Sequence, residues 1–566
     1  MKRNILVTSA LPYANGPIHL GHLIEYIQSD IWSRYHKLSG QNCWSICADD
    51  AHGTPVMISA QKKNITPEEM ISITQKEHQQ DLAAFGVHFD CYSSTHTDIN
   101  KDQVYEIYQL LKTSNLIDKK TVEQFYDEEQ KIFLPDRFIK GNCPRCDSPE
   151  QYGDGCDKCG EIYSPTDLKN PYSVLSKSSP KIRSSEHYFF KLSDPRCISF
   201  LREWTTQAVQ EEILNKIKEW LGNDEDKPAN LTDWDISRDK PYFGFPIPDD
   251  PDKFFYVWLD APIAYISTSH ELCKQKGISL QDVWGQNSKY EIYHFIGKDI
   301  VYFHALFWPA MLKFSGKKLP TKIFVHGFLT VNREKMSKSR GNFVGANDYI
   351  SANLNPEWMR YYVAAHSGKS IKDMDISWNE FSNMVNSHLI GKYINIFSRS
   401  AGLIDKFEGK LLTHRELVSS DQDLETMLLK MKSIIKEAYE SRDFSKVTRE
   451  VMIAADAINK SIDENKPWSL AKNKSPENDF RLLSCLSVAI RGFVLLTSYL
   501  GPIIPQTVKK IEKFILCKEP INMDITDKLA DMAIKVSSNR EQLMGRITSE
   551  HQNIFNSSQT GTKNEK

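Results

Sequence analysis

Residues 12–22, Pro-Tyr-Ala-Asn-Gly-Pro-Ile-His-Leu-Gly-His, constrain the fold of this chain more than any other stretch. Before them, residues 5–8 form a short apolar run rich in β-branched side chains, which predicts a buried strand. Two prolines, an asparagine and a glycine then break the pattern and predict a turn. From Ile18 to Gly40, apolar residues recur at helical spacing. The chain is therefore predicted to begin with a strand, a loop and a helix.

In such a unit, the free backbone N–H groups and the positive dipole end of the helix lie at the carboxyl edge of the sheet. Anionic groups such as phosphate bind there. His19 and His22 are three residues apart, so their imidazoles project from the same face of the first turn. Gly21 between them leaves room for a flat base or a ribose. Two surface histidines on an ordinary helix would give the same pattern, so this stretch alone does not decide the function.

A second motif, Lys-Met-Ser-Lys-Ser at residues 335–339, follows about three hundred residues later. By itself it is typical of a solvated basic loop. The two motifs in this order resemble the histidine and lysine signatures of the class I aminoacyl-tRNA synthetases. Residues 49–55, 255–262 and 294–304 further resemble the methionyl-tRNA synthetase family, and the resemblance covers residues 1 to about 540.

The resemblance implies an α/β fold of the bacterial type with a single four-cysteine zinc knuckle. A Rossmann-type parallel-sheet catalytic domain would carry an inserted zinc-knuckle connective domain and precede an α-helical bundle that binds the anticodon. The expected segments are the two catalytic halves, the insertion with its knuckle at 143–159, the lysine-loop region, the helical domain, and a C-terminal helix with a polar tail. The catalytic halves are expected at 1–115 and 232–325, and the insertion at 116–231. The lysine-loop region follows at 326–385, the helical domain at 386–530, and the C-terminal helix and tail at 531–566.

Composition places few limits on this interpretation. A chain of 566 residues holds about three or four domains, and 40% hydrophobic with 25% charged residues is ordinary globular usage. The net charge of −2 gives no support to a strongly basic nucleic-acid binder, although a local basic face can still bind RNA. The longest apolar stretch, residues 493–504, is interrupted by Gly501 and Pro502 and falls short of a membrane span. We expect a cytoplasmic protein without a membrane partner.

Two Cys-x-x-Cys pairs, separated by nine residues, lie inside the predicted insertion. Four thiolates at this spacing suit one tetrahedral Zn²⁺, and a small segment with little apolar content needs such a metal to fold. Because four cysteines leave no open coordination position, the ion is expected to be structural. A redox pair is the alternative. The predicted ligands are Cys143, Cys146, Cys156 and Cys159. The other seven of eleven cysteines are scattered, which suits a reducing compartment.

A second predicted strand, residues 43–47, ends just before Asp49 and Asp50. Ligands of open α/β sheets gather at the carboxyl ends of strands, and the resemblance assigns Asp50 to the amino group of methionine. The alternative is that both carboxylates only cap the next helix.

The resemblance also implies a methionine pocket. An apolar aromatic cage suits a thioether, because sulfur–aromatic contacts contribute about 0.3–1.5 kcal/mol each. Tyr265 and His304 can present polar atoms to the sulfur. An aromatic stripe is, however, more often plain core. The residues that match the family's methionine-binding positions are Tyr13, Asp50, Trp258, Ala261, Pro262, Tyr265 and His304.

The resemblance implies a methionine–tRNA ligase, EC 6.1.1.10. Methionine and ATP, accompanied by Mg²⁺, would give methionyl-adenylate and pyrophosphate, and the methionyl group would pass to the terminal adenosine of initiator and elongator tRNA(Met). Neither step needs a protein nucleophile, so the expected equipment is positioning and charge stabilisation. The predicted catalytic residues are His19, His22, Lys335 and Lys338. The predicted ATP-binding residues are Pro12, Tyr13, Ala14, Asn15, Gly16, Gly21, Arg238, Asp299, Met336, Ser337, Lys338 and Ser339.

Amphipathic helical patterns between about residues 386 and 527 predict a helical bundle. Asn395, Arg399 and Trp468 match the family's anticodon-reading residues, although Trp468 alone is typical of a packing residue. Readers of RNA loops stack bases on aromatic rings and read base edges with amide and guanidinium groups. Residues 557–566 are polar enough to be disordered. We expect a monomer, because the dimerisation domain of longer relatives does not follow.

Three rival interpretations remain open at this point. Another nucleotidylyl transferase would not need the helical domain. A non-catalytic tRNA-binding paralogue is expected to lose signature residues, and both signatures are intact. The cysteinyl-tRNA synthetases hold zinc in the amino-acid pocket, whereas the four ligands predicted here are self-contained.

Overall fold

The strand, loop and helix predicted at the start of the chain are present in the computed structural model. β1 (Asn4–Ser9) leads through a loop into α1 (Leu20–Leu38), and β2 (Asn42–Asp49) follows. The structure describes residues 2–135, 138–153, 155–156, 158–159, 161, 163–222, 229–336 and 343–552.

Five strands form the central sheet in the order β15-β14-β1-β2-β3, and each neighbouring pair is parallel. The remaining strands are β3 (Cys91–Ser94), β14 (Glu291–Gly297) and β15 (Lys322–His326). The order runs outward from β1 in both directions, so a crevice opens at the carboxyl ends of β1 and β14. Ligands of open parallel sheets bind in such a crevice. The predicted Rossmann-type sheet is confirmed.

Helices cover both faces of this sheet, and its strands are therefore apolar on both sides. Ile5 and Val7 share one buried cluster with α1 and α11 (Pro356–His366), whereas Leu6 shares another with α4 (Asp98–Thr113) and α7 (Val257–Lys276). The alternation along β1 sends successive side chains into opposite cores.

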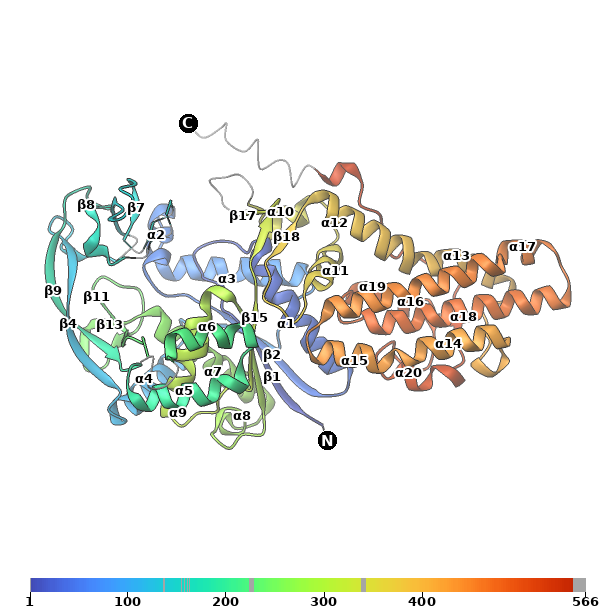
Figure 1. Cartoon of the computed structure of the whole chain (residues 1–566), viewed down its shortest axis with the longest axis horizontal. Coiled ribbons are helices and arrows are strands. Elements are labelled where there is room, and N and C mark those ends of the chain that lie inside the picture. The colour runs from blue at the N-terminus through green and yellow to red at the C-terminus, as the bar shows by residue number, and fades with distance from the viewer. Residues whose placement is uncertain are drawn as a thin grey trace.

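The inserted segment lies at one end of the molecule in Figure 1, beyond the sheet. β4 (Ile117–Asp127) and β9 (Lys181–Phe190) form a long antiparallel pair, and β6 (Ile139–Asn142), β7 (Gln151–Tyr152) and β8 (Lys169–Ser173) form a small sheet. The last part of the segment packs against the central sheet again. It consists of α5 (Pro195–Ala208) and α6 (Glu211–Leu221). Their buried Leu201 and Ile217 share the cluster that contains Ile323 of β15.

A helical bundle extends from the other side of the sheet (Figure 1) and confirms the predicted helical region. Its long members are α13 (Asn395–Ile404), α14 (Ser419–Lys430), α16 (Phe444–Asn465) and α18 (Pro476–Leu500). Within the described residues, α18 alone is long and apolar enough to cross a membrane, and 83% of its most apolar window is buried inside the structure. This burial is typical of the central helix of a bundle.

The helix predicted within residues 531–566 is not found in the described part of that segment. Residues 531–552 hold the last residue of the 3₁₀ turn Leu529–Asp531, the strand β20 (Lys535–Val536), which pairs with β19 (Ile515–Leu516), and a second 3₁₀ turn at Ser549–Gln552. The side chain of Asn386 makes two hydrogen bonds of 2.9 Å to the backbone of Ile547, which ties the extended chain to the bundle. Serine, asparagine and glycine favour such irregular backbone over helix. The polar tail, residues 557–566, lies outside the described residues.

Candidate functional site

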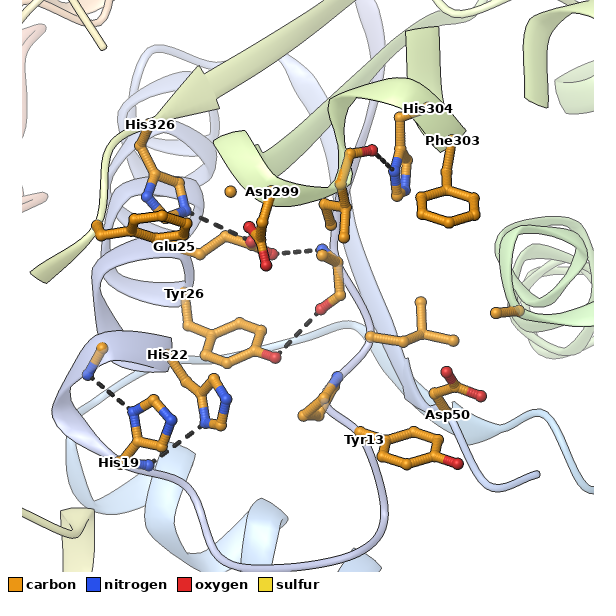
Figure 2. Close-up of a pocket in the computed structure, with 18 of the residues that line it drawn as sticks. Tyr13, His19, His22, Glu25, Tyr26, Asp50, Asp299, Phe303, His304 and His326 are labelled. Atoms are coloured by element: carbon orange, nitrogen blue, oxygen red, sulfur yellow. Dashed lines mark hydrogen bonds and ion pairs between the residues drawn. The ribbon is translucent and has the colours of Figure 1, made fainter. Parts of the chain in front are cut away.

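A cavity of about 410 Å³ lies in the crevice that the strand order creates. Ala10 follows β1, Asp50 follows β2, and Gly297 and His326 end β14 and β15, so all four reach its wall from the carboxyl ends of strands. Figure 2 shows His19 and His22 on one side of the cavity and His304 on another. The sequence-predicted residues in the wall are Pro12, Tyr13, His19, Gly21, His22, Asp50, Trp258, Ala261, Pro262, Tyr265, Asp299, His304 and Met336.

His19 and His22 form a stacked pair at the start of α1. Their ring centroids are 3.6 Å apart. The Gly21 N–H donates to His19 Nδ1 over 3.1 Å, and the His19 N–H donates to His22 Nδ1 over 3.4 Å. Burial and the proximity of His19 and His78 hold the pKa of His22 well below its usual range. Because Nδ1 of His22 accepts, its neutral ring carries the proton on Nε2 and presents it as a donor.

The other backbone N–H groups of this first turn, which were expected to meet a phosphate, are also hydrogen-bonded within the protein. The Leu20 N–H donates to Val344 O over 3.1 Å, and the His22 N–H donates to His19 O over 3.0 Å. The expectation of free N–H groups at this helix end is therefore wrong for this conformation. The Nε2–H of His22 is therefore the donor that the first turn offers to a ligand.

The space beside Gly21 is filled by the lysine-signature segment. A Cβ atom at Gly21 would lie 2.9 Å from Met336 Cε and 3.0 Å from the His19 ring. Phe343 makes an edge contact with His19, with centroids 5.2 Å apart. We expected a base or a ribose in the space beside Gly21, but Met336 occupies it. The two signatures are therefore in direct contact.

Asp50 offers a buried carboxylate to the cavity. Its Oδ1 has no hydrogen-bond partner among the described residues. Burial, and then the charge of Asp260, raise the pKa of Asp50 well above its ordinary value. The helix-cap alternative is wrong for both aspartates, because α2 (Thr54–Lys63) has Gly53 at its N-cap and no side-chain cap. A buried acceptor of this kind suits a cationic ligand group.

Aromatic rings make the wall opposite the histidines. Trp258 stacks on Phe303 with ring centroids 3.6 Å apart. His304 Nδ1 donates to Ile300 O over 3.1 Å, so its Nε2 accepts from the Tyr265 hydroxyl at 2.9 Å. Burial lowers the pKa of His304 to about 4, which keeps the ring neutral. The polar hydrogens of Tyr265 and His304 are thus already committed, and the expectation that they would face a sulfur atom is wrong for this conformation.

Other predicted ATP-binding residues lie elsewhere. Ala14, Asn15 and Gly16 shape the loop and are not in the wall of the cavity, and Ala14 N–H donates to Asp50 O over 2.8 Å. Arg238 faces a neighbouring cavity of about 590 Å³ that shares Tyr13, Asp50, Trp258 and Asp299 with the first. The backbone of Lys335 pairs with Thr330. The predicted residues Ser337, Lys338 and Ser339 lie outside the described part of the chain.

Sequence reasoning missed Glu25, Tyr26, Phe303 and His326, which all line the cavity. Glu25 accepts a hydrogen bond from the Ala10 N–H and lies 3.5 Å from His326 Nε2 (Figure 2). Burial raises the pKa of Glu25 to about 7. Only Glu25 gave a signal in the sequence, because it is a charged residue on the otherwise apolar face of α1.

The four predicted metal ligands come together in the insertion. The sulfur atoms of Cys143, Cys146, Cys156 and Cys159 all lie within 4.8 Å of one another. The Cys146 N–H and the Cys159 N–H donate to the sulfur three residues earlier, over 3.5 and 3.4 Å. Such a cluster can hold one metal ion.

The three predicted anticodon residues also gather, at the far end of the bundle. The Arg399 guanidinium lies 5.3 Å from the ring centroid of Trp468 in α17 (Pro467–Lys472), and Arg399 pairs with Asp463. Asn395 donates to Asn459 Oδ1 over 3.3 Å. Trp468 is 42% exposed, which leaves a ring face accessible.

Comparison with known proteins identifies the family. The sequence model described as tRNA synthetases class I (M) matches residues 5–401. Methionine–tRNA ligase of Neisseria meningitidis serogroup B is 49% identical over 97% of this chain and 79% of its own length. The chain belongs to the methionine–tRNA ligases of class I. The ligase of Nitrosomonas europaea is 52% identical over 91% of this chain and 73% of its own.

A solved structure confirms the architecture of this class I ligase. Mycobacterium tuberculosis methionyl-tRNA synthetase, in complex with methionyl-adenylate, superposes with a TM-score of 0.77 and 21% identity. The match covers 96% of this chain and all of the other. At that identity, the likeness supports the fold alone.

Proposed function

We propose that the cavity joins methionine to ATP and that the same chain transfers the methionyl group to tRNA(Met). The observation that carries this proposal is the position of one cavity between two unlike walls. One wall has the stacked pair of His19 and His22, with the neutral His22 ring as a donor, and the other has the buried Asp50 carboxylate beside aromatic rings.

Methionine would bind at the aromatic wall. Its ammonium would pair with Asp50, whose buried oxygen has no partner among the described residues. Its thioether would contact the stacked Trp258 and Phe303 rings and the ring of Tyr265. Because both polar hydrogens of the Tyr265–His304 pair are already used, selectivity against leucine would come from shape and ring contacts, which are worth about 1–3 kcal/mol per methylene-sized difference.

ATP would enter as its Mg²⁺ complex and place its phosphates against His19 and His22, where the Nε2–H of His22 would donate. A methionine carboxylate oxygen would form the bond to the α-phosphorus while the bond to pyrophosphate breaks. Lys335 and Lys338 would meet the charge that develops on pyrophosphate. Pro12, Tyr13, Gly21, Asp299 and Met336 would shape this half of the cavity. Ala14, Asn15 and Gly16 would support it from the loop, with Arg238 in the adjoining cavity.

In the second step, the 2′-hydroxyl of the terminal adenosine would attack the methionyl carbonyl, and AMP would leave. Asn395, Arg399 and Trp468 would read the anticodon, because an exposed ring beside a guanidinium and an amide suits splayed RNA bases. The monomeric state, the cytoplasmic location and the absence of a membrane partner stay predictions.

We further propose that the four cysteines hold Zn²⁺. A tetrahedral site with Zn–S bonds of about 2.3 Å has sulfur–sulfur edges of about 3.8 Å. The Cys143–Cys159 and Cys146–Cys156 sulfur atoms are 3.8 and 3.6 Å apart, which fits. The ion would supply folding energy to the small β6–β7–β8 sheet.

Metal analysis tests the zinc proposal. The purified chain is expected to hold one zinc per molecule, and the double variant Cys146→Ser, Cys159→Ser is expected to hold none. Because metal binding and folding are coupled, the variant is also expected to become protease-sensitive within residues 138–176. A chain without zinc, or a variant that retains it, would contradict the proposal.

Exchange of labelled pyrophosphate into ATP tests the ligase proposal. The assay is run with each of the twenty amino acids and then with tRNA charging by labelled methionine. Methionine alone is expected to drive exchange. Exchange driven by another amino acid would overturn the assigned pocket, and tRNA binding without any exchange would favour a non-catalytic paralogue.

A further inference from the structure

His78 lies directly behind the histidine-signature loop and belongs to neither wall of the cavity. It projects from α3 (Pro67–Ala84) and is 1% exposed. Its Nδ1 lies 2.7 Å from Asp49 Oδ1, and its Nε2 lies 2.7 Å from the backbone oxygen of Gly16. The ring therefore joins the end of β2 to the tip of the loop that leads to His19.

Both partners of His78 are acceptors. A backbone carbonyl has no proton, and Asp49 Oδ1 itself accepts from the Tyr92 hydroxyl over 2.5 Å. The tyrosine proton is retained, because burial and the charge of Asp49 raise the pKa of Tyr92 well above its ordinary value. Each ring nitrogen of His78 must then supply a proton, and a histidine with two N–H groups is an imidazolium. The contact with Asp49 raises the pKa of His78 despite the burial of the ring, in agreement with this assignment.

We propose that His78 is a positioning residue for the ATP step: a buried imidazolium, held by Asp49, that fixes the Gly16 carbonyl and thereby the loop that carries His19 and His22. The inference rests on the proposed function, because it assigns ATP to that loop. It gives Asp49 a role distinct from that of Asp50.

The loop is bonded at both ends, and two side chains bond its middle: His78 at Gly16 O over 2.7 Å and, over a longer 3.3 Å, Ser59 Oγ at Asn15 O. At one end, Asp50 N–H donates to Pro12 O over 2.9 Å; at the other, Ala346 N–H donates to Ile18 O over 2.9 Å. Between them, Pro17 has no N–H group and is exposed. The bond from His78 to Gly16 O is charge-assisted and partly buried, so it is stronger than a neutral bond at the surface. Loss of this bond would let the loop, and with it the histidine pair, move away from the phosphates.

The charge of His78 has a second effect on the catalytic pair. Together with burial and His19, it lowers the pKa of His22 and so keeps that ring neutral, with its proton on Nε2. The titratable groups that face or surround His78 are Asp49, Tyr92 and His22 from other elements, and Asp81 with its neighbour Glu77 on α3.

The pH dependence follows from the direction of the shift. A raised pKa means that the imidazolium is present below that pKa and is lost as the pH rises through it. The KM for ATP in pyrophosphate exchange is therefore expected to rise at pH values above the raised pKa of His78. The KM for methionine is expected not to follow this change, because the methionine wall does not contact the loop tip.

Two matched variants separate positioning from folding. In His78→Gln, the neutral amide nitrogen can still reach Gly16 O; in His78→Asn, the amide can reach only Asp49. We expect His78→Asn to raise the KM for ATP about tenfold, and His78→Gln to raise it less and to remove the pH-dependent rise. The control is His366→Asn. His366 bonds a backbone carbonyl and a carboxylate in the same way, at 2.9 and 3.2 Å, in α11 away from the signature loop.

Equal rises in both KM values together with a lower melting temperature would assign His78 a general structural role and overturn the proposal. An unchanged KM for ATP in both variants would also overturn it. The protonation state is tested apart from catalysis, by nitrogen-15 NMR of histidine-labelled protein. The signal that disappears in His78→Gln is expected to show two protonated nitrogens at neutral pH. If the wild type fails to exchange pyrophosphate while this signal is present, only the proposed function fails.

Discussion

At the scale of single residues, the cavity is lined by polar groups from His22 and Asp50 that each offer one atom to a ligand. Nδ1 of His19 and Nδ1 of His22 both accept capping bonds, and the neutral His22 ring keeps its Nε2–H for the cavity. Asp50 keeps one oxygen without a partner. A buried polar atom without a partner costs about 1–3 kcal/mol. A cationic ligand group that pairs with the Asp50 oxygen would recover this cost.

Asp50 gives the first prediction. Its raised pKa means that the carboxylate is lost as the pH falls through that value, so methionine is expected to bind less tightly on the acid side. Asp50→Asn is expected to raise the KM for methionine roughly tenfold to a hundredfold, about 1.4–2.8 kcal/mol, and to abolish this pH dependence. Pyrophosphate exchange across a pH series measures both. An unchanged methionine KM in the variant would contradict the assignment.

Gly21 gives the second prediction. An alanine there would place its methyl group 2.9 Å from Met336 Cε and 3.0 Å from the His19 ring, so one of the two must move. Because the thioether is flexible and the His19 ring is held by a capping bond, we expect stability to be retained and the exchange rate to fall about tenfold. Gly402→Ala is the control, since nothing lies within 4 Å of that position. An exchange rate equal in Gly21→Ala and wild type would contradict the contact between the signatures.

At the scale of elements, sequence predicted the parts whose chemistry depends on local spacing. The strand before residue 12, the helix after Ile18 and the four cysteines each follow from a short pattern. Glu25, His78 and His326 could not be found in this way. Their roles depend on partners far along the chain: His78 contacts Asp49 and Gly16, and Glu25 contacts His326. In the sequence, each is only a polar residue in a helical or strand pattern.

The corner between α13 and α17, where Arg399 lies beside Trp468, gives the third prediction. Trp468→Ala removes the exposed ring beside Arg399, so the KM for tRNA in charging is expected to rise at least tenfold, since base stacking contributes about 1–3 kcal/mol. Exchange without tRNA is expected to change less than twofold, because the corner is remote from the cavity. Phe480→Ala is the matched control, an aromatic residue 49% exposed on α18. Equal charging defects in both variants would remove the special role of Trp468.

At the scale of the whole molecule, the sheet and the helical bundle share one hydrophobic core. The cluster that contains Ile5 of β1 continues through α1 and α11 to Phe493 of α18. Arg360 joins these parts with buried bonds: its guanidinium pairs with Asp30 at 2.7 Å and donates to Pro502 O and Ile503 O at 2.8 Å. The bundle is therefore an extension of the catalytic body.

Arg360 gives the fourth prediction. In Arg360→Met, Asp30 and the backbone oxygens of Phe85, Pro502 and Ile503 each lose a hydrogen-bond donor. The free energy of unfolding is therefore expected to fall by about 3–5 kcal/mol. Urea unfolding followed by tryptophan fluorescence measures the change. Arg415→Met is the control, since that side chain is 84% exposed and its pair with Asp531 is worth about 0–1 kcal/mol. A loss below about 1 kcal/mol for Arg360→Met would show that this buried ion pair does not hold the two parts together.

The most direct test of the central claim, that one cavity serves both steps, is a single-turnover experiment. The chain is mixed with excess ATP and labelled methionine, quenched, and assayed for methionyl-adenylate; tRNA is then added to a parallel sample. The account predicts about one equivalent of bound adenylate per chain, which disappears as labelled tRNA appears in equal amount. No adenylate, or adenylate that tRNA fails to consume, would contradict it.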